Sequence, residues 1–105
     1  MDTENDSMLE RILEQYEDAE FLTADGLDDA IIGVCEDMNK PPRLIYSVKK
    51  CIEITAKDME VDESELEDGQ TIEDKQHEMA LEYLEYNTFG GYVGEKTPVW
   101  CRDDF

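Results

Sequence analysis

Apolar side chains recur at helical spacing near the start of the chain. From Ser7 onward they fall three or four residues apart, as one face of an amphipathic helix requires, at Met8, Leu9, Ile12, Leu13, Tyr16 and Ala19. Ser7 and Glu10 also have the spacing of a capping box, in which each side chain accepts a backbone N–H of the other residue. The pattern therefore predicts an N-terminal helix, preceded by a polar, frayed segment at residues 1–6.

Two short apolar runs follow, and they predict a pair of strands. Residues 30–35, AIIGVC, are short and rich in β-branched side chains, and a turn signal at Asp25-Gly26 precedes them. Pro41-Pro42 predicts a loop, because the residue before a proline avoids the helical conformation. Residues 43–46, RLIY, are then expected to form the return strand of a hairpin.

Two further helices are predicted in the second half of the chain. Ser47 is a favourable N-cap for a helix at residues 47–59. Its inner face carries Val48, Cys51, Ile52, Thr55, Ala56 and Met59. Thr71 and Asp74 have the spacing of a second capping pair, which predicts another helix at residues 71–89.

The end of the chain completes the expected fold. Gly90-Gly91 is expected to end the last helix, and residues 97–101 are expected to form a closing strand. The acidic residues 57–71 lie between the two later helices and predict a loop or irregular insertion. The sequence thus predicts a small single α+β domain, 1–105, with an N-terminal helix, a short antiparallel sheet of about three strands and two further helices.

Charge is the strongest compositional feature of the chain. Its 105 residues include 29 acidic and 9 basic side chains, which give a net charge of −20. Direct binding to nucleic acid or to an anionic membrane needs clustered Lys and Arg, so this balance argues against both. The natural partner of such a surface is a basic protein, or one whose site normally holds a polyanion.

The remaining composition favours a soluble protein of the cytoplasm. Three cysteines, an odd number, are typical of free thiols in a reducing compartment. The first residues lack the basic and apolar regions of a secretion signal. The sequence contains no apolar run of the roughly 18 residues that a membrane span needs.

Candidate metal and catalytic residues have simpler interpretations. Cys35, Cys51, Cys101 and His77 lack the close pairing of zinc ligands. The span from Asp62 to Glu73 has the length of a calcium loop but not its ligand and glycine positions. Acid–base catalysis needs two carboxylates in different environments, and the sequence singles out no such pair. We therefore expect no metal, no cofactor and no enzymatic activity.

The distribution of acidic residues suggests a function. Acids occur in the first helix, around the Asp25–Asp29 turn, through residues 57–78 and on the last helix, rather than in a detachable tail. On a helix they repeat about every 5.4 Å, a scale similar to the phosphate spacing of about 3.4 Å along a duplex strand. The residues expected to bind a partner are Glu10, Glu14, Glu17, Asp18, Asp62, Glu63, Glu65, Glu67 and Asp68.

A second candidate site lies at the Asn87–Thr97 turn, beside Tyr46. Its GEKT sequence partly resembles a phosphate-binding loop, but the glycine spacing is wrong and Pro98 follows instead of a helix N-terminus. A nucleotide site is therefore not expected, and the turn is either a helix stop or a small-ligand or housekeeping site. Its candidate residues are Asn87, Tyr92, Lys96 and Trp100.

Three stretches of the chain resemble a set of small, mostly uncharacterised proteins of tailed bacteriophages. The stretches are DGLDDAIIGV (Asp25–Val34), RLIYSVKKCIEI (Arg43–Ile54) and ALEYLEYNTFGGYVGEKTPVW (Ala80–Trp100). The phage proteins carry a DGFDxAIIGV block, a hydrophobic strand and helix, and an EYFEYNxxGAYVGExTP block. This chain differs in its acidic N-terminal helix and its enlarged acidic stretch at 57–78. The resemblance carries no catalytic residue over to this chain.

Together, charge and resemblance predict an acidic phage-type interaction protein in the cytoplasm of a bacterial host. It would bind and inhibit or modulate a basic, nucleic-acid-binding host protein, by DNA mimicry at that protein's nucleic-acid site. The expected targets are a restriction enzyme, a CRISPR effector, a nucleoid protein or a polymerase. The chain itself would contact neither nucleic acid nor membrane, and would act as a monomer or a homodimer.

Overall fold

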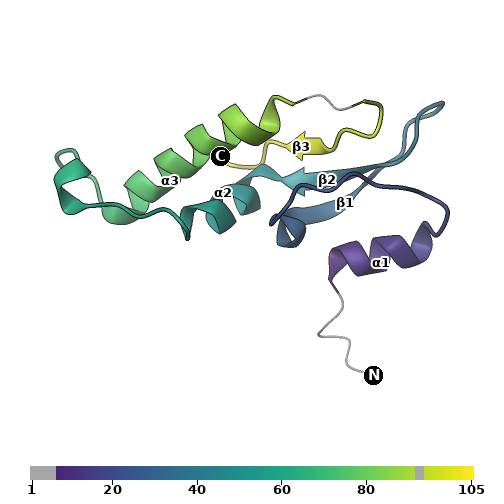
Figure 1. Cartoon of the computed structure of the whole chain (residues 1–105), viewed down its shortest axis with the longest axis horizontal. Helices are drawn as coiled ribbons and strands as arrows, with labels where there is room; N and C mark the ends of the chain where they lie inside the picture. The colour runs from purple at the N-terminus through teal and green to yellow at the C-terminus, as the bar shows by residue number, and fades with distance from the viewer. Residues whose placement is uncertain (1–6, 92–93) are drawn as a thin grey trace, which may run out of the picture.

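The computed structural model describes residues 7–91 and 94–105 (Figure 1). The segment 1–6, predicted to be frayed, and the candidate site residue Tyr92 lie outside the described residues. The elements in chain order are α1 (Met8–Gln15), the 3-10 helix η2 (Asp28–Ala30), β1 (Ile31–Cys35), β2 (Arg43–Ser47), α2 (Val48–Ala56), the 3-10 helix η3 (Glu63–Glu65), α3 (Ile72–Leu84), the π-helix η4 (Glu85–Phe89) and β3 (Val99–Cys101). The predicted α+β class is confirmed.

All three α-helices begin at the caps that the sequence predicts. The Ser7 hydroxyl accepts the backbone N–H of Glu10 at 3.1 Å, and the Ser47 hydroxyl accepts that of Lys50 at 3.1 Å. Thr71 and Asp74 form a complete capping box at the start of α3. Each cap satisfies a backbone N–H that has no partner within its helix.

The sheet is mixed, so the prediction of a purely antiparallel sheet is wrong. β1 and β2 form the expected antiparallel hairpin, with Val34 opposite Leu44. β3 instead runs parallel to β2, with Trp100 beside Tyr46. Figure 1 shows the reason: α2 continues from the end of β2, α3 runs back, and the chain then re-enters the sheet in the direction of β2. Two helices between the strands thus permit a parallel pair.

The core lies between one face of the sheet and the helices. Leu44 and Tyr46 alternate along β2 on the buried face, and both are fully buried. The other buried apolar residues are Ile12 from α1, Leu27, Ala30 and Ile31 before and within β1, Val48, Cys51 and Ile52 from α2, and Ala80 and Leu84 from α3. The last helix therefore completes the core with side chains distant in sequence, and the partly buried Trp100 of β3 packs against this core.

The C-terminal segment is joined to the start of α2. The Asp103 carboxylate accepts the Lys49 backbone N–H at 2.9 Å and the Ser47 hydroxyl at 2.5 Å. The Lys49 N–H first and the Ser47 hydroxyl second hold the pKa of Asp103 below its usual value. A carboxylate at a helix N-terminus also interacts favourably with the helix dipole. This residue therefore links the end of the chain to the junction of β2 and α2.

Candidate functional site

The N-terminal acidic cluster consists of Glu10, Glu14, Glu17 and Asp18. Glu10 and Glu14 lie one helical turn apart on α1, and Glu17 and Asp18 lie in the turn that follows it. All four side chains are exposed. α1 is fixed to the rest of the fold by buried Ile12 and by the Tyr16 hydroxyl, which donates to Glu36 at 2.6 Å. The carboxylates of α1 therefore project from an anchored helix.

The η3 acidic cluster consists of Asp62, Glu63, Glu65, Glu67 and Asp68, and all five side chains are exposed. The segment predicted to be an irregular loop holds a short 3-10 helix here. Asp62 accepts the Ser64 backbone N–H at 3.2 Å, and Glu65 accepts the Asp62 backbone N–H at 3.2 Å. Two of the five acids thus shape the backbone on which the other three are displayed.

Hydrogen bonds to α3 hold the segment around η3 in place. The Gln76 amide donates to the Met59 backbone carbonyl at 2.8 Å, and the Gln70 amide donates to Glu78 at 3.0 Å. Gly69 adopts a positive φ of 80°, which permits the turn into α3. The acidic segment is thus folded against α3.

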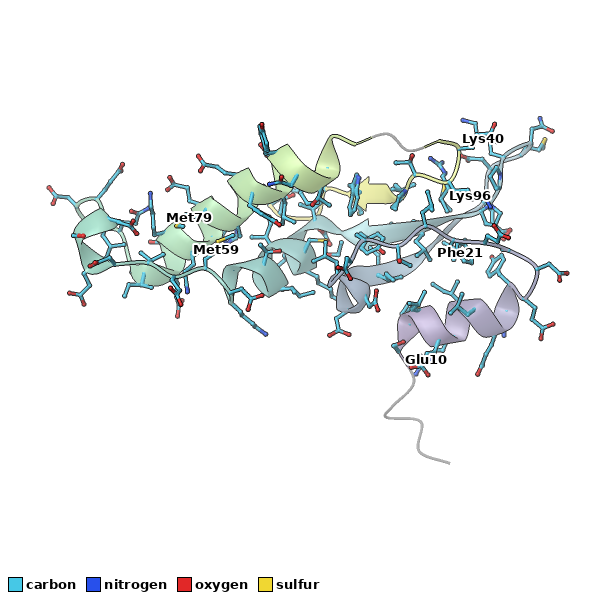
Figure 2. All side chains as sticks on the ribbon, viewed as in Figure 1. Glu10, Phe21, Lys40, Met59, Met79 and Lys96 are labelled. Atoms are coloured by element: carbon cyan, nitrogen blue, oxygen red, sulfur yellow. The ribbon has the colours of Figure 1, made fainter. Side chains whose placement is uncertain are left out.

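The two acidic clusters lie at opposite ends of the molecule. Its extents are 51 × 37 × 22 Å, and Figure 1 shows α1 towards one end of the longest axis and η3 at the other. Lys40 and Lys96 lie at the same end as α1 (Figure 2). The nine predicted acids therefore form two separate surfaces.

None of the nine predicted acids forms an ion pair within residues 7–91 and 94–105. The ion pairs found there join Arg43 to Asp37, Lys75 to Glu78, Lys96 to Glu20 and Arg102 to Asp104. Apart from half-buried Asp104, every acidic side chain of the described chain is exposed. The charge of both clusters is therefore available to a partner.

The second candidate site is divided by the structure. Asn87 and Trp100 line one cavity of about 660 Å³. Lys96 lines a different cavity of about 620 Å³, and its ammonium group lies 3.5 Å from the Glu20 carboxylate. Two of the four predicted residues are therefore brought together, Lys96 is not, and Tyr92 is outside the described residues.

Most of the residues around Asn87 and Trp100 are not indicated by the sequence. The cavity also borders the segment Leu22–Leu27, together with Tyr83, Thr88 and Pro98. That segment is held over the sheet because its Ala24 backbone N–H donates to the Tyr46 hydroxyl at 2.8 Å. The contact spans 22 positions of the chain, and no local pattern signals it.

Trp100 is the centre of an aromatic cluster beside this cavity. Its ring centroid lies 5.0 Å from that of Tyr46 and 4.9 Å from that of Phe89. These distances are within the range of favourable aromatic pairs. The indole Nε1 is buried and has no hydrogen-bond partner in the described part of the chain. The cluster therefore joins η4 to β2 and β3.

The cysteines and the histidine lie on separate elements. Cys35 ends β1, Cys51 is buried in α2, Cys101 ends β3, and His77 is exposed on α3. Among residues 7–91 and 94–105, no group of three or more His, Cys, Asp or Glu side chains has a metal-binding arrangement. The Arg43 guanidinium lies 3.5 Å from the Cys35 sulfur and 2.7 Å from Asp37, so that thiol borders an ion pair.

Comparisons with known proteins identify no relative of this chain. No protein-family model matches the chain, and neither the curated proteins nor the solved structures contain a match. Within the described residues, every helix falls short of the length and apolarity needed to cross a membrane.

Proposed function

We propose that this chain is an acidic interaction protein that binds a basic, nucleic-acid-binding protein and inhibits or modulates it by occupying its nucleic-acid site. One observation carries the proposal: all nine acids of the two clusters are exposed, and none forms an ion pair within the described chain. Carboxylates without cationic neighbours repel one another and weaken the compact state. A basic partner would relieve that repulsion.

The ordered backbone under the η3 acidic cluster supports mimicry rather than a flexible acidic tail. Asp62 and Glu65 form a capping box, and the hydrogen bonds of Gln70 and Gln76 connect the segment to α3. Acids held in place lose less conformational entropy on binding than acids on a disordered tail. Such a surface can therefore compete with the regular phosphates of a duplex.

The separation of the two clusters limits the kind of partner. The molecule is 51 Å long, which corresponds to about 15 base pairs at about 3.4 Å each. A partner that contacts both clusters needs an extended basic groove, as a duplex-binding protein has. A partner with a small basic pocket would contact only one cluster.

The biological setting belongs to the same proposal. The likeness to phage proteins supports a phage-encoded protein that acts in the host cytoplasm, and we propose that it has no enzymatic activity. Restriction enzymes, CRISPR effectors, nucleoid proteins and polymerases are the target classes that such a protein would meet. Electrostatic steering would make association fast and sensitive to salt.

A second candidate function is a small-ligand or housekeeping module. The cavity lined by Asn87 and Trp100 favours it, since about 660 Å³ falls within the usual range of ligand sites. The position of Lys96 in another cavity weakens it. Under this function, replacing Asn87 or Trp100 would abolish binding and reversing the charge of the acidic clusters would have no effect.

Capture from a bacterial lysate tests the leading proposal. The tagged protein is incubated at low and at moderate salt, with and without excess duplex DNA. We expect a DNA- or RNA-binding protein to be recovered at low salt and to be lost when duplex DNA is added. Recovery of no protein, or of one indifferent to both salt and DNA, would contradict the proposal.

A further inference from the structure

A continuous hollow runs between the Leu22–Leu27 segment and the last helix. The cavity of about 660 Å³ and a neighbouring one of about 280 Å³ share four lining residues, Asp25, Leu27, Tyr83 and Thr88. We call the two cavities together the Tyr83 groove, because Tyr83 borders both. Leu27 is buried, whereas the Tyr83 side chain is 52% exposed.

The groove combines apolar walls with an acidic rim. Leu22, Leu27 and Trp100 line the larger cavity, and Ile54, Met59 and Leu84 line the smaller one. The charged residues that line it in the described chain are Asp25 and Asp58, and both are exposed. Its charge is therefore negative, as is that of the whole chain.

This chemistry selects one class of occupant. A bare polycation gains nothing from the apolar walls, and a neutral apolar molecule gains nothing from the two carboxylates. A basic segment with one large apolar side chain uses both, because the side chain is removed from water while Lys or Arg residues lie against the rim. Aromatic side chains anchor protein interfaces in this way.

We propose that the Tyr83 groove binds a basic segment of the partner protein by enclosing one of its aromatic side chains. The inference rests on the proposed function, and it adds a site of specificity to the charge attraction. The acidic clusters would attract any basic protein, whereas the groove would retain one whose basic segment carries a suitably placed aromatic residue. The inference therefore predicts that the protein dissociates more slowly from a partner with such an aromatic residue than from a basic partner without one.

Two short synthetic peptides of Lys and Arg test the inference, one with a central Trp and the other with Ala at that position. Their affinities are measured by calorimetry with the wild-type protein and with Tyr83→Ala, Leu22→Ala and Tyr86→Ala. Tyr86 is the matched control, since it lies in η4, is 89% exposed and does not line the groove. Leu22 and Tyr83 come from different walls and are both exposed.

We expect the Trp peptide to bind the wild type and Tyr86→Ala roughly tenfold more tightly than the Ala peptide. Tyr83→Ala and Leu22→Ala should remove most of this difference. Equal binding of the two peptides, the absence of binding by either, or an unchanged preference in Tyr83→Ala would overturn the inference.

Charge reversal separates this inference from the proposed function. Lysine substitutions in the η3 acidic cluster should weaken the binding of both peptides and leave the ratio of their two affinities unchanged. One outcome is that the two peptides bind with equal affinity while charge reversal in the η3 acidic cluster still weakens the binding of both. In that case the groove does not bind the aromatic side chain, and the proposed acidic interaction function remains. If the Trp peptide still binds more tightly than the Ala peptide but duplex DNA fails to displace the captured partner, the proposed function is wrong and the groove is still a binding site.

Discussion

The hydroxyl of Tyr46 accepts the backbone N–H of Ala24 at 2.8 Å. Tyr46 lies on the buried face of β2, and Ala24 lies in the segment that precedes η2. This hydrogen bond holds the Leu22–Leu27 segment over the sheet, and the segment in turn forms one wall of the Tyr83 groove. Burial, the largest influence, raises the pKa of Tyr46, so the hydroxyl stays protonated at neutral pH.

Removal of that hydroxyl should loosen the segment without unfolding the protein. Tyr46→Phe leaves the Ala24 N–H without its acceptor, and we expect a loss of about 1 kcal/mol in the free energy of unfolding. Urea denaturation measures the loss, and amide exchange at Ala24 should accelerate. Tyr83→Phe is the control, because that hydroxyl is on an exposed side chain. Equal stability of Tyr46→Phe and the wild type would show that the hydrogen bond does not hold the segment.

Asp103 should make stability depend on pH. Its folded pKa is lowered below the usual 3.8, so its contribution is present above that value and is lost as the pH falls through the lowered pKa. Asp103→Asn imitates the protonated carboxyl. The variant should therefore melt below the wild type at pH 7, and the two melting temperatures should converge in strong acid.

A control variant isolates the hydrogen bonds of Asp103 from its charge. Asp68→Asn removes the same charge from an exposed position in the η3 acidic cluster. Because acid relieves general repulsion in every variant, only the difference from the wild type is informative. A difference for Asp103→Asn that stays constant from neutral to strongly acidic pH would refute its assigned role.

Cys51 should be the least reactive of the three thiols. Burial first, and the Asp103 charge second, raise its pKa to about 11. At pH 8 roughly one thousandth of this thiol is then ionised, and the thiolate is the reactive form. Alkylation of the native protein followed by mass spectrometry should label the half-buried Cys35 and Cys101 before Cys51. Labelling of Cys51 as fast as Cys101 would contradict this burial.

Reversal of the η3 acidic cluster should weaken partner binding and flatten its salt dependence. Glu63→Lys, Glu67→Lys and Asp68→Lys together spare the capping residues Asp62 and Glu65. Since surface charges act through steering, the association rate should fall more than the dissociation rate rises. Surface plasmon resonance over a salt series with the captured protein measures both rates.

The matched control for this variant reverses the same number of charges elsewhere. Asp29, Glu82 and Glu95 are exposed and lie outside both acidic clusters. Their reversal changes the net charge equally, so a similar loss of binding would assign the attraction to net charge rather than to the η3 acidic cluster.

The local elements of this fold could be predicted because their signals are local. Ser7, Ser47 and Thr71 each cap the helix that the sequence assigns to them. The first helix is shorter than its apolar pattern, however, and ends at Gln15 before Ala19. Asp62 and Glu65 form a further capping box with the same three-residue spacing as Thr71 and Asp74. Its spacing in the sequence could therefore have predicted the short helix η3.

Long-range relationships could not be predicted from the same patterns. The direction of β3 depends on how α2 and α3 return the chain, which no residue of β3 encodes. Asp103 meets Ser47 across 56 positions, and Ala24 meets Tyr46 across 22. The sequence predicts that the acids of both clusters bind a partner, but their placement at opposite ends follows only from the tertiary fold.

Displacement of DNA tests the central claim most directly. The captured partner is purified and saturated with a fluorescently labelled duplex at low salt, and this protein is then added while the anisotropy of the duplex is followed. The account predicts that the duplex is released in proportion to the protein added, and that the η3 reversal variant releases less than the wild type does. A stable ternary complex, in which partner, duplex and this protein remain together, would contradict it.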